Sequence, residues 1–291
     1  MILSRKETVM KKLIITADDY GMCEDVNRAI EECTAAGIVL STNVMTNMPC
    51  CEAAANLREK FPGLSVGLHY NFTAGTPMSP ADKVSTLIDK DGKFLSYNKI
   101  REACKRKAYD FGQIKTEMET QYKRYVEICG EPDYWNTHQN VHVYPDLYAL
   151  FRDVSLELGI KKMRSHQRIF VPASNGKSDK SLKWTLTNPV KCRMLDSWQK
   201  KSREMGVESP DGILVRMNEA DKLNLPYLLK NIKWKNNSIA ELIIHPSVTP
   251  DCEYFGGITE GRVREYEVFS DSETKLTADK NNIEIVSFKA L

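Results

Sequence analysis

Features that mark several protein classes are missing from this sequence of 291 residues. The formal net charge is only +2 although 27% of the residues are charged, so the composition indicates neither a nucleic-acid-binding protein nor an acidic tail. No stretch approaches the roughly 20 apolar residues that a membrane-spanning helix needs. We therefore expect a protein that binds neither nucleic acid nor a membrane.

The first nine residues also lack the apolar core of a signal peptide, and several of them are charged. Met10 precedes two lysines and looks like a second start position. We expect residues 1–9 to be an N-terminal extension. Residues 10–291 would form a single domain, because no internal repeat, low-complexity run or linker divides them.

Cysteine occurs eight times, but the sequence contains no Cys-x-x-Cys pair. A zinc site built from thiolates is therefore not expected. Reduced cysteines that pack in the interior are typical of a chain of this length without a secretion signal. We expect free thiols and a cytoplasmic location.

Short apolar segments with the character of strands alternate with segments whose apolar residues recur at helical spacing. Gly37 follows the first helical segment at a position where helices commonly end. This alternation predicts a parallel sheet built from βαβ units, in an α/β barrel. The expected strands are 13–18, 38–44, 64–68, 134–137, 160–163, 212–215, 240–244 and 283–288, and the expected helices are 24–36, 53–60, 113–129, 145–158, 221–232 and 261–270.

Two long segments break this rhythm. Residues 70–112 contain glycine and proline turns together with apolar residues, so we expect an ordered insertion. Residues 165–210 show no clear period but carry many basic side chains, which are expected to form a solvent-exposed face; contact with an acidic or phosphorylated substrate is the alternative. These side chains are Arg168, Lys177, Lys180, Lys183, Lys191 and Arg193.

Polar residues stand at the carboxyl ends of five predicted strands. Three of only five histidines do so, whereas chance placement would scatter them over helices and loops. In a parallel α/β barrel these strand ends share one face, and that face carries the active site. The residues are Asp18 and Asp19, His69, His138, Arg164 and His245.

One aspartate together with His69 and His138 forms a ligand set suited to a divalent metal with open positions for water or substrate. Such an ion makes water easier to deprotonate and polarises a carbonyl group. The other aspartate could then act as a general base and His245 as a general acid. The residues alone leave open which of Asp18 and Asp19 takes which role.

Two further residues have more than one interpretation. Arg164 would orient the aspartate that acts as base and keep it ionised, or else it is a structural cation. His142 follows His138 by four residues, so the two would share one face of a helix. However, Pro145 predicts that the helix begins later. His142 is therefore a metal ligand, a substrate contact or a structural residue, and His166 is expected to be structural.

Four motifs stand in order along the chain. They are Thr16-Ala17-Asp18-Asp19-Tyr20-Gly21, Val66-Gly67-Leu68-His69-Tyr70-Asn71-Phe72-Thr73, Thr137-His138-Gln139-Asn140-Val141-His142 and Ile244-His245-Pro246. Together they resemble the YdjC-like family of carbohydrate deacetylases, which includes enzymes that deacetylate chitooligosaccharides. The resemblance spans Leu13 to the C-terminus and implies a distorted (β/α) barrel related to polysaccharide deacetylases of the NodB type.

The resemblance also implies separate roles for the site residues. Asp19, His69 and His138 would ligate the metal, Asp18 would be the general base and His245 the general acid. The family is described with magnesium, whereas NodB-type enzymes generally use zinc. Two imidazole ligands favour zinc or another transition metal, so the identity of the divalent ion stays open.

The reaction implied by the resemblance is hydrolysis of an N-acetyl group on an amino sugar or a short chitooligosaccharide, phosphorylated or not. One alternative is a metal-dependent hydrolase of a carbohydrate ester or phosphoester. Another is a sugar-binding barrel without catalysis, although a binder needs neither a base nor an acid. A homodimer is expected only because dimers are the commonest oligomers.

Overall fold

A computed structural model describes residues 11–171, 186–214, 225–234 and 239–291. All paired strands in these residues run parallel, in one sheet of order β4-β3-β2-β1-β7-β6-β5, with β8 beside β1. The strands are β1 (Lys11–Tyr20), β2 (Ser41–Val44), β3 (Ser65–Tyr70), β4 (Trp135–Thr137), β5 (Arg168–Ile169), β6 (Gly212–Leu214), β7 (Ile239–Ile244) and β8 (Ile283–Val286).

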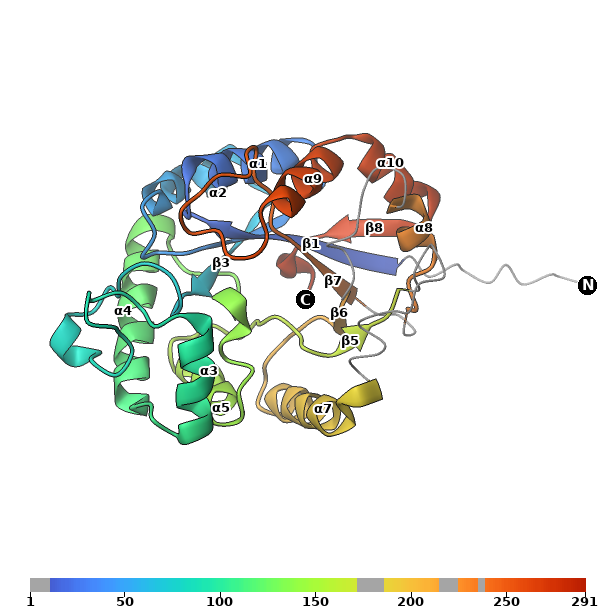
Figure 1. The fold of residues 1–291 in the computed structure, drawn as a ribbon. Helices are drawn as coiled ribbons and strands as arrows, with labels where there is room; N and C mark the ends of the chain where they lie inside the picture. Colours follow the sequence, from blue (N-terminus) through green and yellow to red (C-terminus); the bar gives the residue numbers. More distant parts are fainter. Residues whose placement is uncertain (1–10, 172–185, 215–224, 235–238) are drawn as a thin grey trace, which may run out of the picture.

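Helices lie on both sides of this sheet. Figure 1 shows α1, α2, α9 and α10 above the strands, α3, α5 and α7 below them, and α4 to their left. The helices are α1 (Glu24–Ala35), α2 (Leu57–Lys60), α3 (Tyr97–Arg106), α4 (Phe111–Cys129), α5 (Pro145–Glu157), α7 (Pro189–Glu204), α8 (Leu225–Lys230), α9 (Glu260–Phe269) and α10 (Glu273–Lys280). Among the helices in the described ranges, none is long and apolar enough to cross a membrane.

Strand β1 lies at the centre of the sheet. It pairs with β7 from Lys12 to Ala17 on one side, and with β8 and then β2 on the other. Its residues from Leu13 onward are buried. A central parallel strand is covered on both faces, which explains why the apolar residues of β1 after Lys12 form a continuous run rather than an alternating one.

The two outer strands of the sheet, β4 and β5, do not pair with each other directly. Single bridges join Trp135 to Met163 and Lys162 to Glu208 in the space between them. The prediction of a strand at 160–163 is therefore wrong, because these residues form isolated β-bridges instead of a continuous ladder of strand hydrogen bonds. The result is a barrel with one weakly joined side, which confirms the expectation of a distorted α/β barrel.

Most of the expected helices are present. The helix expected at 53–60 is a 3-10 helix, η1 (Cys51–Asn56), followed by one α-helical turn in α2. Helices α3, α7 and α10 were not expected from the sequence. Several expectations fall outside the described residues, namely the extension at 1–9, the end of a strand at Val215, the start of a helix at 221–224, and Lys177, Lys180 and Lys183.

The insertion at 70–112 is ordered, as expected. Glu117 of α4 is fully buried and accepts hydrogen bonds from the backbone N–H groups of Met78 and Ser79, at 2.9 and 2.8 Å. A buried carboxylate is tolerated only where such donors compensate its charge. Glu117 therefore anchors the first part of the insertion against α4.

Candidate metal and catalytic site

Adjacent residues in a regular strand point to opposite faces, yet Asp18 and Asp19 both face the same site. The register between β1 and β2 shifts between Ala17 and Tyr20, and Asp19 has a positive φ of 76°. A bulge of this kind redirects a side chain, and a positive φ at a residue other than glycine is uncommon and concentrates at functional sites. The local distortion of β1 thus brings both carboxylates to one place.

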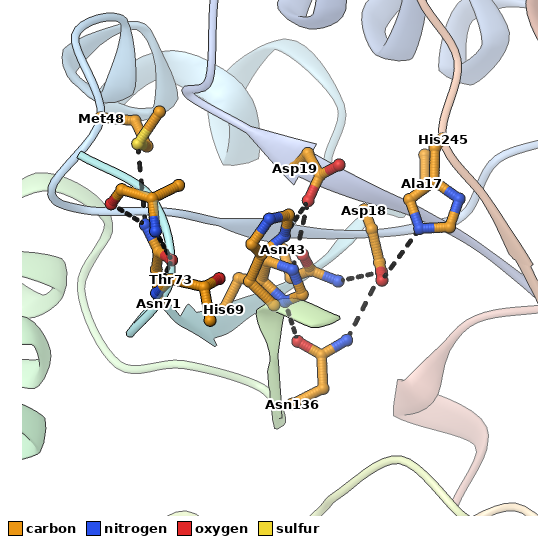
Figure 2. A network of polar contacts seen from close by, with 12 residues as sticks. Ala17, Asp18, Asp19, Asn43, Met48, His69, Asn71, Thr73, Asn136 and His245 are labelled. Atoms are coloured by element: carbon orange, nitrogen blue, oxygen red, sulfur yellow. Dashed lines mark hydrogen bonds and ion pairs between the residues drawn. The ribbon is translucent and has the colours of Figure 1, made fainter. Parts of the chain in front are cut away.

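Asp19 lies against two imidazoles. Its Oδ1 is 2.9 Å from Nδ1 of His138 and 3.3 Å from Nε2 of His69. The three ligand atoms lie within 4.8 Å of one another, and all three residues are buried. Figure 2 shows Asp19 and His69 facing each other at the carboxyl ends of β1 and β3. Two imidazole nitrogens and a carboxylate oxygen at this spacing fit a small divalent ion with open positions.

Asp18 has a different set of partners. Arg164 binds both of its oxygens, with Nη1 2.8 Å from Oδ2 and Nη2 2.7 Å from Oδ1, and Asn43 donates to Oδ1 at 2.6 Å. Burial alone would raise the pKa of Asp18, but the Arg164 guanidinium outweighs it and holds the pKa well below the usual value. The site therefore contains a carboxylate that stays ionised beside the Asp19 triad.

Arg164 is itself held from the opposite side. Its Nε donates to Oε1 of Glu241 at 3.0 Å, and Thr16 donates to the same oxygen at 2.9 Å. Glu241 lies in the middle of β7 and is fully buried. Burial raises the pKa of this carboxyl group. Glu241 is a positioning partner that fixes the direction of the guanidinium fork toward Asp18.

His245 follows β7 at the edge of the site. Its Nε2 lies 3.9 Å from Oδ2 of Asp18, a contact drawn in Figure 2. Burial lowers the pKa of His245 to about 4, so its imidazole is neutral at pH 7. The backbone N–H of His245 donates to Glu265 of α9 at 2.6 Å, and burial raises the pKa of Glu265 to about 7.

These residues open onto a cavity of about 390 Å³. Gln139 and Asn140 line it with exposed side chains on backbone of positive φ, and Gly256 lines it as well. Arg168 also lines this cavity, so one member of the expected basic group reaches the site. A larger groove of about 700 Å³ beside α1 contains none of the candidate residues, so we place the chemistry in the smaller cavity.

His142 does not join the triad. Its Nε2 lies 2.6 Å from Nε2 of His166, its Nδ1 lies 2.6 Å from the Thr137 hydroxyl, and it does not line the cavity. Burial lowers the pKa of both histidines. The interpretations of His142 as a ligand or a substrate contact are therefore wrong, and the structural interpretation fits, as does the one given for His166.

Two residues that contact the site, Arg262 and Glu241, were not predicted from the sequence. Arg262 of α9 donates to Oδ2 of Asp19 at 2.7 Å, and its guanidinium stacks 4.4 Å from the ring of Phe255. Nothing in the sequence distinguishes Arg262 from a surface arginine. Glu241 did carry a signal, because a carboxylate interrupts the apolar run of β7. Asn136, in β4 two residues before His138, also contacts the site through Nδ1 of His69.

The chain is similar to several known proteins. The model of the family described as "YdjC-like protein" matches residues 12–280. A carbohydrate deacetylase of Danio rerio is 34% identical over 154 residues, which cover 53% of this chain and 49% of that protein. A chitooligosaccharide deacetylase of Proteus mirabilis is 25% identical over 283 residues, which cover 96% of this chain and 98% of that protein.

The match to the Danio rerio protein thus spans about half of its length. Among solved structures, that of a putative cellobiose-phosphate cleavage protein from Enterococcus faecalis V583 superposes with a TM-score of 0.75 at 21% identity, covering 97% of this chain and 98% of that one. This likeness shows a shared fold. Because the family model covers nearly the whole chain, the protein belongs to the YdjC-like family.

Proposed function

We propose that the protein is a metal-dependent hydrolase that removes N-acetyl groups from amino sugars or short chitooligosaccharides. One observation carries the proposal: two neighbouring carboxylates have separate partners at one cavity, Asp19 with two imidazoles and Asp18 with Arg164. A metal ligand beside an independent ionised base is what metal-assisted hydrolysis requires. The names of the relatives from Danio rerio and Proteus mirabilis support the same reaction.

Asp19, His69 and His138 would hold the metal ion. A divalent ion there supplies Lewis acidity, which makes water easier to deprotonate and polarises the acetyl carbonyl. Resemblance to the family favours Mg²⁺, whereas the two imidazole nitrogens favour Zn²⁺ or another transition metal. Both ions belong in any test of activity.

Asp18 would take the proton from the attacking water. Its bidentate pair with Arg164 keeps it ionised and fixes its orientation, as a general base requires. His245 would deliver a proton to the departing amine. Because His245 is neutral at pH 7, its Nε2 can take up the proton that Asp18 accepts before the amine leaves, through one bridging water or after the two groups close the 3.9 Å that separate them.

The substrate class includes phosphorylated sugars. Arg168 lines the cavity, where a guanidinium suits a phosphate or another anionic group. The name of the Enterococcus faecalis protein, which shares the fold, also refers to a sugar phosphate. Both observations favour a short chitooligosaccharide that carries a phosphate over a long neutral polymer.

The proposal is tested by measuring acetate release from N-acetylglucosamine and N-acetylated chitooligosaccharides, each with and without a phosphate. Protein stripped with a chelator and then loaded with Zn²⁺, Mg²⁺ or Mn²⁺ is compared with stripped protein. We expect acetate release only from the loaded protein. Absence of release from every substrate with every ion would refute the deacetylase, and faster hydrolysis of acetyl esters or phosphoesters would favour the alternative hydrolases.

A further inference from the structure

The side-chain amide of Asn136 lies between the proposed metal triad and the Asp18–Arg164 pair (Figure 2). Asn136 is fully buried in β4. Its Oδ1 faces Nδ1 of His69, and its Nδ2 lies 3.4 Å from Oδ1 of Asp18. The proposed reaction gives this amide no role, yet it contacts both halves of the site.

In the orientation shown in Figure 2, the amide oxygen accepts a hydrogen bond from His69. The imidazole proton then resides on Nδ1, which leaves a lone pair on Nε2, the nitrogen that lies 3.3 Å from Asp19. This tautomer is ready to bind a metal ion. In this orientation the amide N–H donates only to Oδ1 of Asp18, over a long 3.4 Å, and it also lies against the N–H donors of Arg164 and Asn43, with which it forms no hydrogen bond.

In the opposite orientation the amide forms hydrogen bonds with Arg164 and Asn43, and His69 is left in the tautomer that does not suit a metal ion. The amide oxygen would accept from Nη1 and Nη2 of Arg164, at 3.0 and 2.9 Å, and from Nδ2 of Asn43 at 3.0 Å. The amide N–H would then donate to Nδ1 of His69, which places the imidazole proton on Nε2, facing Asp19. This orientation gives hydrogen bonds to His69, Arg164 and Asn43 and gives up only the long contact with Asp18, but its tautomer blocks the lone pair that a metal needs.

We infer that Asn136 is a positioning residue whose amide orientation sets the tautomer of His69 and thereby tunes the affinity of the site for a metal ion. The metal-free protein holds the orientation that serves Arg164 and Asn43. Metal binding turns the amide toward His69 and gives up those hydrogen bonds. Groups that orient a ligand histidine typically change metal affinity about 10–100-fold, so the coupling is large enough to measure. The inference rests on the metal site of the proposed function.

A carboxylate at this position would not face this conflict. Both of its oxygens accept hydrogen bonds, so it could serve the N–H of His69 and the donors of Arg164 and Asn43 together. Asn136→Asp therefore removes the cost of turning the amide. It also adds a negative charge beside Asp18, whose Oδ1 lies 3.4 Å from the present Nδ2, so it repels Asp18 and strengthens binding of any cation, and a control must separate charge from orientation.

Asn43→Asp is the matched control. Asn43 is also a fully buried amide that donates to Oδ1 of Asp18, at 2.6 Å, but none of its described contacts is with His69. It therefore places a second carboxyl group against Asp18, at the 2.6 Å contact, without adding an acceptor for the histidine. Zn²⁺ affinity is measured for the wild-type chain and both variants by competition with a chelator, with folding checked by circular dichroism.

We expect Asn136→Asp to bind Zn²⁺ at least about tenfold more tightly than Asn43→Asp and the wild type. Equal tightening in both variants, or none in Asn136→Asp, would overturn the inference. If the wild type binds no Zn²⁺, the metal site itself is refuted and the inference with it. If Asn136→Asp binds Zn²⁺ more tightly as expected but the protein releases no acetate, the proposed substrate class is refuted and the role of Asn136 is upheld.

A second measurement uses only the wild-type chain, so it does not depend on whether Asn136→Asp folds. Nitrogen-15 NMR of histidine side chains distinguishes the two neutral tautomers. We expect the proton of His69 on Nε2 in the metal-free protein and on Nδ1 after addition of Zn²⁺. A proton on Nδ1 in both states would overturn the inference, because the amide would then have no orientation to change.

Discussion

Arg262 and Asp19 form a buried ion pair in which Nη2 lies 2.7 Å from Oδ2. The other oxygen of Asp19 faces the imidazoles of His69 and His138. The two oxygens of one carboxylate are thus divided between α9 and the proposed metal ligands. Arg262 fixes the direction of the oxygen that remains for a metal ion, and it links the C-terminal part of the chain to the end of β1.

Replacing Arg262 by methionine removes this pair and leaves a buried carboxylate with less compensation. Removing one partner of a buried ion pair typically costs about 3–5 kcal/mol. We expect Arg262→Met to lower the free energy of unfolding of the metal-free protein by that order. Because Zn²⁺ would supply the missing positive charge, the stabilisation by Zn²⁺ should be larger in the variant than in the wild type.

Urea unfolding with and without Zn²⁺ measures both effects. Arg264→Met is the control, since Arg264 lies on the same helix with an exposed side chain. A change of no more than about 0.5 kcal/mol is expected there. Equal stabilisation of the wild type and Arg262→Met by Zn²⁺ would mean that Arg262 does not share its carboxylate with the metal.

Replacing each of the two aspartates by asparagine should change a different quantity, the rate of acetate release for one and the affinity for Zn²⁺ for the other. Asp18→Asn removes a general base, so the rate of acetate release should fall roughly 10²–10⁴-fold while Zn²⁺ affinity changes little. Asp19→Asn removes a ligand, so Zn²⁺ affinity itself should fall. Titration with Zn²⁺ and acetate release at saturating Zn²⁺ distinguish them. Loss of Zn²⁺ binding in Asp18→Asn with residual rate would mean that the two roles are exchanged.

The sequence predicted the centre of this site because of one topological rule. Carboxyl ends of parallel strands meet on one face, so Asp18, Asp19, His69, His138 and His245 could be brought together from strand positions alone. Predicting where these residues lie required only that the strands be recognised in the sequence. The apolar runs of β1, β3 and β7 made the strands easy to recognise.

The supporting residues could not be predicted in the same way. Arg262 contacts a carboxylate 243 residues earlier in the chain, and only the packing of α9 against the barrel decides which helical arginine does so. The bridges at Met163 and Lys162 depend on how the outer strands approach each other, which no local pattern records. Helix α7 lies in a segment whose prolines and Asn188 obscured its period.

The buried pair of His142 and His166 should make the protein sensitive to acid. Burial lowers the pKa of His166 to about 3 from an ordinary value of 6.5. A group with a lowered pKa in the folded state stabilises the protein above its unfolded pKa, and this stability is lost as the pH falls from 6.5 toward 3. For one histidine the slope reaches about 1.4 kcal/mol per pH unit.

His166→Gln should reduce this slope by up to about 1.4 kcal/mol per pH unit, the contribution of one titrating proton. Glutamine can accept the same hydrogen bond without titrating. Urea unfolding from pH 4.5 to 7.5 measures it. Glu265 acts in the opposite direction, since its pKa is raised from 4.5 to about 7 and its contribution falls as the pH rises through that range. The difference between variant and wild type removes the contribution of Glu265 and reports on His166 together with His142, whose pKa His166 also lowers. An unchanged slope would show that His166 titrates normally.

Gly67 of β3 lies two residues before His69 and has no room for a side chain. A Cβ atom there would lie 2.7 Å from two ring atoms of Tyr134 and 2.8 Å from its carbonyl oxygen. The ring cannot move away, because it stacks on Phe288 with centroids 3.7 Å apart. Gly67→Ala should therefore cost about 1–3 kcal/mol and, by displacing β3, weaken Zn²⁺ binding at His69.

Gly63→Ala provides the matched control, since no heavy atom lies within 4 Å of its added Cβ. We expect its free energy of unfolding to stay within about 0.5 kcal/mol of the wild type, with unchanged Zn²⁺ affinity. Gly67→Ala with wild-type stability would show that β3 and β4 can separate at this point. If stability fell but Zn²⁺ affinity did not, the position of His69 would be set by Asn136 and Asp19 rather than by the path of β3.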